Sequence, residues 1–201
     1  MKNNILILYP KEFNSYSKFS RKVSKIIQNL DIFNIYYYVD FNNFISKFIE
    51  DSNISIKSYK TNNLKEITHA IIFDDGEEFM EERDYFKNNN IPIRLINILI
   101  TRVINIKNDS NFDKKNTKYE YIGRGSYWGN PYSLLDNNFD DITRENVINQ
   151  FKYDFDNDAF INKKKSEVFK LAGKRLACFC KPEACHGDIL ADFLNSIDDG
   201  K

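Results

Sequence analysis

All three cysteines of the chain lie beside one of its two histidines, within the segment LACFCKPEACHGDIL at residues 176–190. The run KRLACFC is predicted as a short strand, which would place Cys178 and Cys180 on one face. The turn KPEA follows, and CHGDILADFLN predicts a helix that begins at Cys185 and His186. We therefore expect the three thiols and the imidazole to converge on one point.

One chemistry open to such a cluster is structural zinc binding, because three thiolates and an imidazole form a complete tetrahedral ligand set. The spacing disfavours it. Cys178 and Cys180 are separated by a single residue, closer than in the usual C-x₂₋₄-C knuckle, and neighbouring residues such as Cys185 and His186 rarely ligate one ion together. No cofactor is therefore expected, with zinc kept as the alternative. Its ligands would be Cys178, Cys180, Cys185 and His186.

The other chemistry is a reactive or anion-binding site at the start of the predicted helix. A helix N-terminus carries partial positive charge and free N–H groups, which lower the pKa of a thiol and bind anions. Cys185 and His186 would act as nucleophile or acid–base groups, and Asp188 would orient His186 or bind a sugar hydroxyl. Gly187 would leave room for a ligand. For the two strand cysteines, simple packing in the core is the favoured interpretation.

A second segment suited to ligand binding is YIGRGSYWGNPYSL at residues 121–134, which has three glycines within seven residues. Glycine frees the backbone for positive φ and for close approach to a ligand. Arg124 between two glycines can present a planar fork to a phosphate or carboxylate. Trp128 and Tyr132 offer flat faces to a base or sugar. A tight turn with Trp128 as a core anchor explains the composition equally well.

The first hundred residues alternate between apolar β-rich runs and segments with helical periodicity. This alternation predicts an α/β fold with a mainly parallel sheet covered by helices, a Rossmann-like domain over residues 1–100. The predicted strands are 4–10, 34–40, 54–59, 69–75 and 91–98, and the predicted helices are 15–30, 41–51 and 77–90.

Residues 101–201 are predicted to form a smaller C-terminal α/β domain. Six of the seven glycines and the single tryptophan lie in the second half, so the two halves are expected to do different work. Besides the strand and helix around the cysteines, the expected elements are a strand at 101–109, a polar loop at 111–120 and helices at 142–155 and 165–174.

Parallel sheets usually bind ligands at the carboxyl ends of their strands. In the first half, Asp74, Asp75 and Gly76 lie at one such end, and residues 9–11 lie at another. No glycine-rich phosphate loop follows the first strand, so a pyrophosphate site is not indicated there. His69 opens a strand and is expected to have a structural or exposed role.

Composition limits the classes of partner and compartment. The 29 basic and 29 acidic residues cancel, which argues against general coating of nucleic acid. No apolar run is long enough for a transmembrane helix, and no signal peptide is found. An odd number of clustered cysteines favours reduced thiols, so we expect a cytoplasmic protein, in the host cytoplasm if it is viral.

Residues 102–195 resemble the domain of unknown function 4326 family, which occurs in phages and bacteria. The resemblance rests on RVINIK (102–107), YIGRGSYWGNPY (121–132), Arg144 and LAGKRLACFCKPEACHGDIL (171–190). The resemblance implies no known reaction, but it implies one site built from both motifs. The resemblance implies that the chain shares with the family the positions Arg124, Ser126, Trp128, Gly129, Asn130, Pro131, Cys178, Cys180, Cys185, His186, Gly187 and Asp188. Residues 68–98 also resemble the SLOG superfamily of nucleotide-binding Rossmann-like domains.

From these patterns we predict that the C-terminal domain binds, and in an enzyme also processes, a nucleotide-like or other phosphorylated small molecule. Whether the protein is an enzyme stays open. The predicted ligand-binding residues are Arg124, Gly125, Ser126, Trp128, Asn130 and Gly187, and the predicted catalytic residues are Cys185, His186 and Asp188. The alternatives are a non-catalytic phage protein that sequesters a host nucleotide signal or blocks a host protein, and a zinc-stabilised module.

Overall fold

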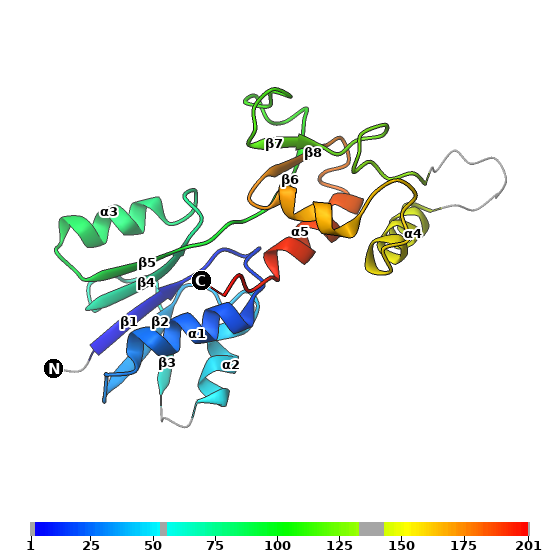
Figure 1. Cartoon of the computed structure of the whole chain (residues 1–201). Coiled ribbons are helices and arrows are strands. Elements are labelled where there is room, and N and C mark those ends of the chain that lie inside the picture. The colour runs from blue at the N-terminus through cyan, green and yellow to red at the C-terminus, as the bar shows by residue number, and fades with distance from the viewer. Residues whose placement is uncertain (1–2, 53–55, 133–142, 201) are drawn as a thin grey trace. The chain divides into compact units, whose positions relative to one another are not determined.

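A computed structural model describes residues 3–52, 56–132 and 143–200 of the chain. The chain divides into two compact units, shown in Figure 1. Unit 1 comprises Met1–Ile98 and Ser196–Lys201, and unit 2 comprises Leu99–Asn195. Independent folding of residues 1–100 and 101–201 as two domains stays a prediction. Among the described residues, no helix has both the length and the apolar character needed to cross a membrane.

Unit 1 is built on a five-stranded sheet in which every neighbouring pair is parallel. The strand order is β3-β2-β1-β4-β5, so the chain reverses its direction of travel between β1 and β4. The predicted α/β class and parallel sheet are confirmed. The strands are β1 (Asn3–Leu8), β2 (Phe33–Tyr37), β3 (Lys57–Lys60), β4 (His69–Asp74) and β5 (Ile93–Asn97).

Helices cover both faces of this sheet because right-handed crossovers in opposite directions place them on opposite sides. The helices are α1 (Tyr16–Ile27), α2 (Phe44–Asp51) and α3 (Met80–Asn88). Phe19 of α1 stacks on Phe73 of β4, with ring centroids 5.2 Å apart. On the other face, Phe86 of α3 is buried with Leu6 and Ile72. Alternate residues of the central strands are therefore buried against different helices, which explains their continuous apolar runs.

Asp40 joins the end of β2 to the start of α2. Its carboxylate accepts hydrogen bonds from the Tyr9 hydroxyl and from the backbone N–H groups of Ile45 and Ser46. These N–H groups belong to the first turn of α2 and have no partner within the helix. Burial raises the pKa of Asp40, but the hydrogen bonds from Tyr9, Ile45 and Ser46 outweigh burial, and the net shift is downward.

We expect Asp40→Ala to lower the free energy of unfolding of unit 1 by about 1–2 kcal/mol at neutral pH. Because the folded pKa is depressed, the contribution of Asp40 is complete above its ordinary value of 3.8 and is lost as the pH falls through the lower, folded value. Thermal unfolding followed by circular dichroism at pH 7 and below pH 4 checks this, with the exposed Asp31→Ala as control. A difference between Asp40→Ala and wild type that grows in acid would contradict it.

Unit 2 contains a second, smaller parallel sheet, ordered β6-β8-β7. Its strands are β6 (Arg102–Asn105), β7 (Tyr119–Tyr121) and β8 (Arg175–Cys178), and its α-helices are α4 (Arg144–Asp156) and α5 (His186–Asn195). The helix expected at 165–174 is instead a 3₁₀-helix, η1 (Lys165–Leu171). β7 lies where a polar loop was expected, because its three residues pair with the central strand β8 rather than forming an apolar run of their own.

The two ends of unit 2 are joined by a buried pair of polar residues, Thr101 and Asn195. The Asn195 side-chain oxygen accepts from the Thr101 N–H at 2.8 Å, and its amide nitrogen donates to the Thr101 carbonyl at 2.9 Å. Beyond Asn195 the chain returns to unit 1, where Asp199 pairs with the buried Lys18 and Asp198 pairs with Arg21. Unit 2 is thus inserted between two segments of unit 1.

Candidate functional site

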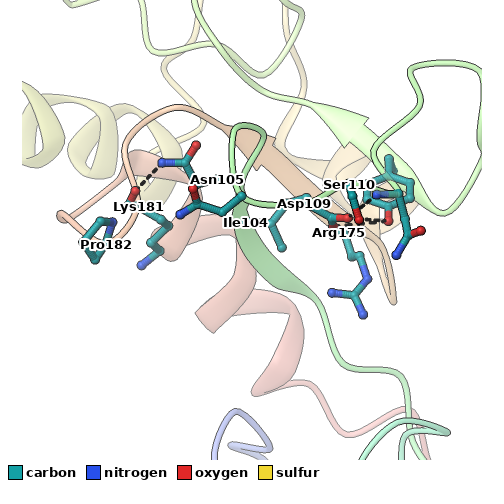
Figure 2. A pocket seen from close by; sticks show the side chains of 10 residues that line it. Ile104, Asn105, Asp109, Ser110, Arg175, Lys181 and Pro182 are labelled. Atoms are coloured by element: carbon teal, nitrogen blue, oxygen red, sulfur yellow. Dashed lines mark hydrogen bonds between the residues drawn. The ribbon is translucent and has the colours of Figure 1, made fainter.

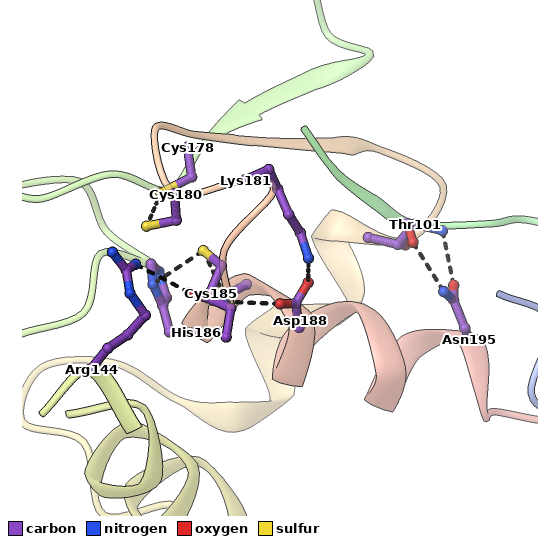
Figure 3. A network of polar contacts seen from close by, with 11 residues as sticks. Thr101, Arg144, Cys178, Cys180, Lys181, Cys185, His186, Asp188 and Asn195 are labelled. Carbon is purple, nitrogen blue, oxygen red and sulfur yellow. Dashed lines mark hydrogen bonds and ion pairs between the residues drawn. The ribbon is translucent and has the colours of Figure 1, made fainter. Parts of the chain in front are cut away.

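The three cysteine sulfurs of unit 2 form one cluster, as Figure 3 shows. Cys178 ends β8, Cys180 follows in the turn, and Cys185 immediately precedes α5. The Sγ atoms of Cys178 and Cys180 are 3.3 Å apart, and all three sulfurs lie within 4.8 Å of one another. Cys178 and Cys185 are buried and Cys180 is half-buried. The strand and the helix start therefore bring the thiols together as expected.

Cys185 and Asp188 cap the start of α5. The Cys185 sulfur accepts from the Gly187 N–H at 3.4 Å, and the Asp188 carboxylate accepts from the Cys185 N–H at 2.9 Å. The thiol therefore accepts from the second residue of the helix, and Asp188 reaches back to the N–H of the residue before it, as the third residue does in a capping box. Asp188 also pairs with Lys181 at 2.6 Å. In this structure the Asp188 oxygens are engaged in capping and in this ion pair rather than with His186, and the catalytic role expected for Asp188 stays a prediction.

His186 is buried, with 5% of its surface exposed. Its Nε2 lies 3.1 Å from the Trp128 carbonyl oxygen, and a carbonyl can only accept, so Nε2 carries the proton. Nδ1 lies 3.7 Å from the Cys185 sulfur. Burial lowers the pKa of His186, which keeps the imidazole neutral. Its ring also packs edge-on against Phe151, at 4.8 Å between centroids.

The thiols of the cluster titrate differently because they share hydrogen bonds. Donation from Cys185, opposed by burial, lowers the pKa of Cys178 to about 5. Donation to Cys178, followed by burial, raises the pKa of Cys185. Burial, followed by its hydrogen bond to Cys178, raises the pKa of Cys180. The cluster therefore favours one thiolate, on Cys178, over three.

The glycine-rich segment forms a tight turn whose members support one another. The Ser126 hydroxyl donates to the Gly123 carbonyl at 2.8 Å, and Gly125 takes a φ of +82°. Neither residue lines the pocket described below. A Cβ on Gly129 would stand 2.5 Å from the Gly123 carbonyl oxygen, so the turn closes too tightly for a side chain there.

Trp128 is the core anchor of this turn. Its side chain is 3% exposed and meets Tyr127 edge-on, at 5.4 Å between centroids. The ring is covered in this structure, as the core-anchor interpretation expects, and its stacking on a ligand stays an untested prediction. Only its backbone carbonyl reaches the site, where it holds His186.

Gly187 also has a packing role rather than the expected open space. A Cβ at this position would lie 2.4 Å from Cδ1 of Ile122 and 3.2 Å from a methyl group of Val103. The first turn of α5 therefore packs directly on β6 and on the residue after β7. The room that glycine leaves is filled by these two side chains in this structure.

A cavity of about 150 Å³ opens beside the cysteine cluster. Its floor includes the three cysteines and His186, and exposed Arg124 and Arg144 stand at its rim. Asn130, whose amide donates to the Val147 carbonyl at 2.9 Å, forms part of its wall. The remaining lining residues are Gly123, Tyr132, Val147, Ile148 and Ala184. We call this cavity the cysteine–arginine pocket.

Arg144 is the pocket residue that residue types alone did not single out. It lies at the start of α4 and donates to the Ala184 carbonyl at 3.3 Å (Figure 3). Its guanidinium also hydrogen-bonds to the Cys180 sulfur and acts to lower the pKa of that thiol. The only sequence signal for Arg144 was the family resemblance over residues 102–195.

A second, larger cavity of about 620 Å³ lies in unit 2 and is lined by residues of β6 and β8, the loop after β6 and the turn residues Lys181 and Pro182 (Figure 2). Its polar side chains mostly serve the fold. Lys181 pairs with Asp188, Tyr119 donates to Asp109, and the Asn105 amide donates to the Lys181 carbonyl. Arg175 lines its wall. No thiol or histidine lines this cavity, so it lacks the chemistry of the cysteine–arginine pocket.

In unit 1, aromatic side chains occupy the carboxyl ends of β1 and β4, where parallel sheets usually bind ligands. Phe13 stacks on Phe73 at 4.9 Å, and Tyr9 lies 5.5 Å from Phe19. The acidic turn after β4 is also engaged. Asp74 pairs with Arg83 at 2.9 Å and accepts from the Gly76 N–H at 3.0 Å. These residues stabilise the fold.

Comparison with known proteins matches each half of the chain to a family. Residues 2–104 match the Minimal SLOG domain, and residues 104–196 match the Domain of unknown function (DUF4326). An uncharacterised 12.4 kDa protein from the nrdA-td intergenic region of Enterobacteria phage T4 is 39% identical over 104 residues, which span 49% of this chain and 81% of the phage protein. No solved structure matches the chain. The chain therefore belongs to the Minimal SLOG domain family, and residues 104–196 are similar to the DUF4326 family.

Proposed function

We propose that the cysteine–arginine pocket binds the phosphate end of a nucleotide-like or other phosphorylated small molecule. The observation that carries this proposal is that Arg124 and Arg144, from separate segments, meet at the rim of one cavity. Two guanidinium groups can give a phosphate several charge-assisted hydrogen bonds. The SLOG family of unit 1 is consistent with a nucleotide-related ligand.

The size of the pocket limits which part of the ligand it holds. Pockets that enclose a whole drug-sized ligand usually measure roughly 300–1,000 Å³. A cavity of about 150 Å³ suits a phosphoryl group, while the base or sugar stays outside. Because the ring of Trp128 is covered, recognition rests on charge rather than on stacking.

A second candidate is ligand binding without turnover, as in a protein that sequesters a nucleotide signal. The burial of Cys185 and His186, which are 2% and 5% exposed, favours it because a nucleophile must reach its substrate. Product analysis after incubation with a nucleotide library separates the two functions. Loss of turnover in His186→Ala with binding retained would favour the enzyme, and binding without product would favour sequestration.

We expect Arg124→Ala and Arg144→Ala each to weaken binding of a phosphorylated ligand by about 1.5–3 kcal/mol, or roughly 10- to 150-fold in Kd. A thermal-shift screen of nucleotides would identify the ligand, and calorimetry would measure Kd. Arg175→Ala, in the larger cavity, is the matched control and should leave Kd unchanged. A ligand whose binding needs Arg175 but neither pocket arginine would overturn the assignment.

A further inference from the structure

We propose that Cys178, Cys180 and Cys185 together bind one thiophilic divalent cation, Zn²⁺ first, with its fourth coordination position facing the cysteine–arginine pocket. This inference does not depend on the proposed function, because the metal can be measured without any phosphorylated ligand.

The distances between the sulfurs fit tetrahedral coordination. With Zn–S bonds of about 2.3 Å, ligand sulfurs in a tetrahedral site lie about 3.8 Å apart. In the cluster, one pair lies at 3.3 Å and all three sulfurs are within 4.8 Å of one another. Side-chain shifts of a few tenths of an ångström would suffice to bring them to equal spacing around one ion.

The backbone around the cluster positions the sulfurs from two directions. β8 and its turn supply Cys178 and Cys180, while the cap of α5 fixes Cys185 through the Gly187 N–H. This N–H donates to the Cys185 sulfur, an interaction that favours the thiolate, the form that binds metals. Arg144 hydrogen-bonds to the Cys180 sulfur in the same way. Three thiolates and Zn²⁺ carry a net charge of −1, which the guanidinium of Arg144 offsets.

The spacing arguments against zinc were the close Cys178-x-Cys180 spacing and ligation by the adjacent residues Cys185 and His186; the first is answered by the sulfur distances, which fit one ion. The sulfur cluster does not require His186, whose Nε2 is held by the Trp128 carbonyl; Nδ1 lies 3.7 Å from the Cys185 sulfur, but His186 is not part of the group whose ligand atoms all lie within 4.8 Å of one another. Three protein ligands and one open position are the arrangement of zinc sites that bind a water or a ligand directly. The fourth position opens toward the cavity that the same three cysteines line.

The test is a Co²⁺ and Zn²⁺ titration of the reduced, EDTA-treated full chain. Tetrahedral Co²⁺–thiolate sites give intense visible and near-ultraviolet bands whose strength follows the number of thiolates. We expect saturation at about one ion per chain, displacement of Co²⁺ by Zn²⁺, and loss of the bands in Cys178→Ser and Cys185→Ser. His186→Ala should keep the bands, as should His69→Ala, the matched control in unit 1.

Because a serine variant can fail to fold, wild-type protein provides a second measurement. Mass spectrometry after alkylation counts the accessible thiols with and without one equivalent of Zn²⁺, and we expect zinc to protect all three cysteines. Failure of Co²⁺ to give thiolate bands, or a Cys178–Cys180 disulfide in place of metal under reducing purification, would overturn the site. Loss of the tetrahedral spectrum in His186→Ala alone would overturn the open fourth position. Metal binding by wild-type protein that binds no phosphorylated ligand would refute the proposed function alone, and ligand binding by wild-type protein that takes up no metal would refute the metal site alone.

Discussion

Phe151→Ala is expected to lower the free energy of unfolding of unit 2 by about 3–5 kcal/mol, the usual cost of removing a buried aromatic ring. Phe151 is completely buried at the centre of unit 2. Its ring lies 4.9 Å from that of Phe160 and 4.8 Å from that of His186. Losing it would open a cavity between α4 and the start of α5, directly behind the cysteine–arginine pocket.

The measurement can be made specific to unit 2, because the single tryptophan of the chain, Trp128, is buried there. Denaturant unfolding followed by its fluorescence should show a lower midpoint for Phe151→Ala. Tyr153→Ala is the matched control, since Tyr153 lies on the same helix and is 68% exposed. Equal destabilisation by the two variants would contradict the packing described for α4.

Asn195→Ala should lower the free energy of unfolding of unit 2 by about 2–5 kcal/mol, because it leaves two buried backbone groups without partners. The Thr101 N–H and carbonyl both bond to the Asn195 side chain, and Thr101 is 1% exposed. Asn195→Asp should not rescue stability. A carboxylate can accept from the N–H but cannot donate to the carbonyl, and it would bury a charge.

Tryptophan fluorescence during denaturant unfolding again provides the measurement. The control is Asn149→Ala on the exposed side of α4, which should change stability little. Hydrogen exchange adds a local test, because the Thr101 amide should lose protection in Asn195→Ala. An unchanged exchange rate at Thr101 would show that this pair does not hold the ends of unit 2 together.

Much of unit 1 could be predicted from the sequence because its central strands, β1 and β4, are buried on both faces. Segments such as 4–10 and 69–75 are continuous apolar runs, and helical periodicity separates them. β7 could not be found this way, because three residues carry no periodicity and their pairing with β8 depends on residues far along the chain. The spacing of apolar residues also could not predict that η1 is a 3₁₀-helix rather than an α-helix.

The convergence of the three thiols followed from strand alternation and a helix start, both of which are local properties. The roles of Trp128 and Asp188 could not be settled in that way. A tryptophan in a glycine-rich turn has the same composition whether its ring is buried or exposed, and only the packing of the whole unit decides between them. Asp188 was assigned to catalysis by its neighbours, whereas its partner is the backbone of its own helix.

The return of the chain to unit 1 after Asn195 makes the two units thermodynamically dependent through connectivity alone. While unit 2 is folded, its ends meet at Thr101 and Asn195, and residues 196–200 follow directly from that meeting point. When unit 2 unfolds, the same attachment closes a flexible loop of about a hundred residues, at an entropic cost on the order of 4 kcal/mol. Asp199 then forms its ion pair with the buried Lys18 less often, and Lys18 loses its counter-charge. Unfolding of unit 2 therefore lowers the local concentration of Asp198 and Asp199 at α1 of unit 1 and weakens the ion pairs that they form there.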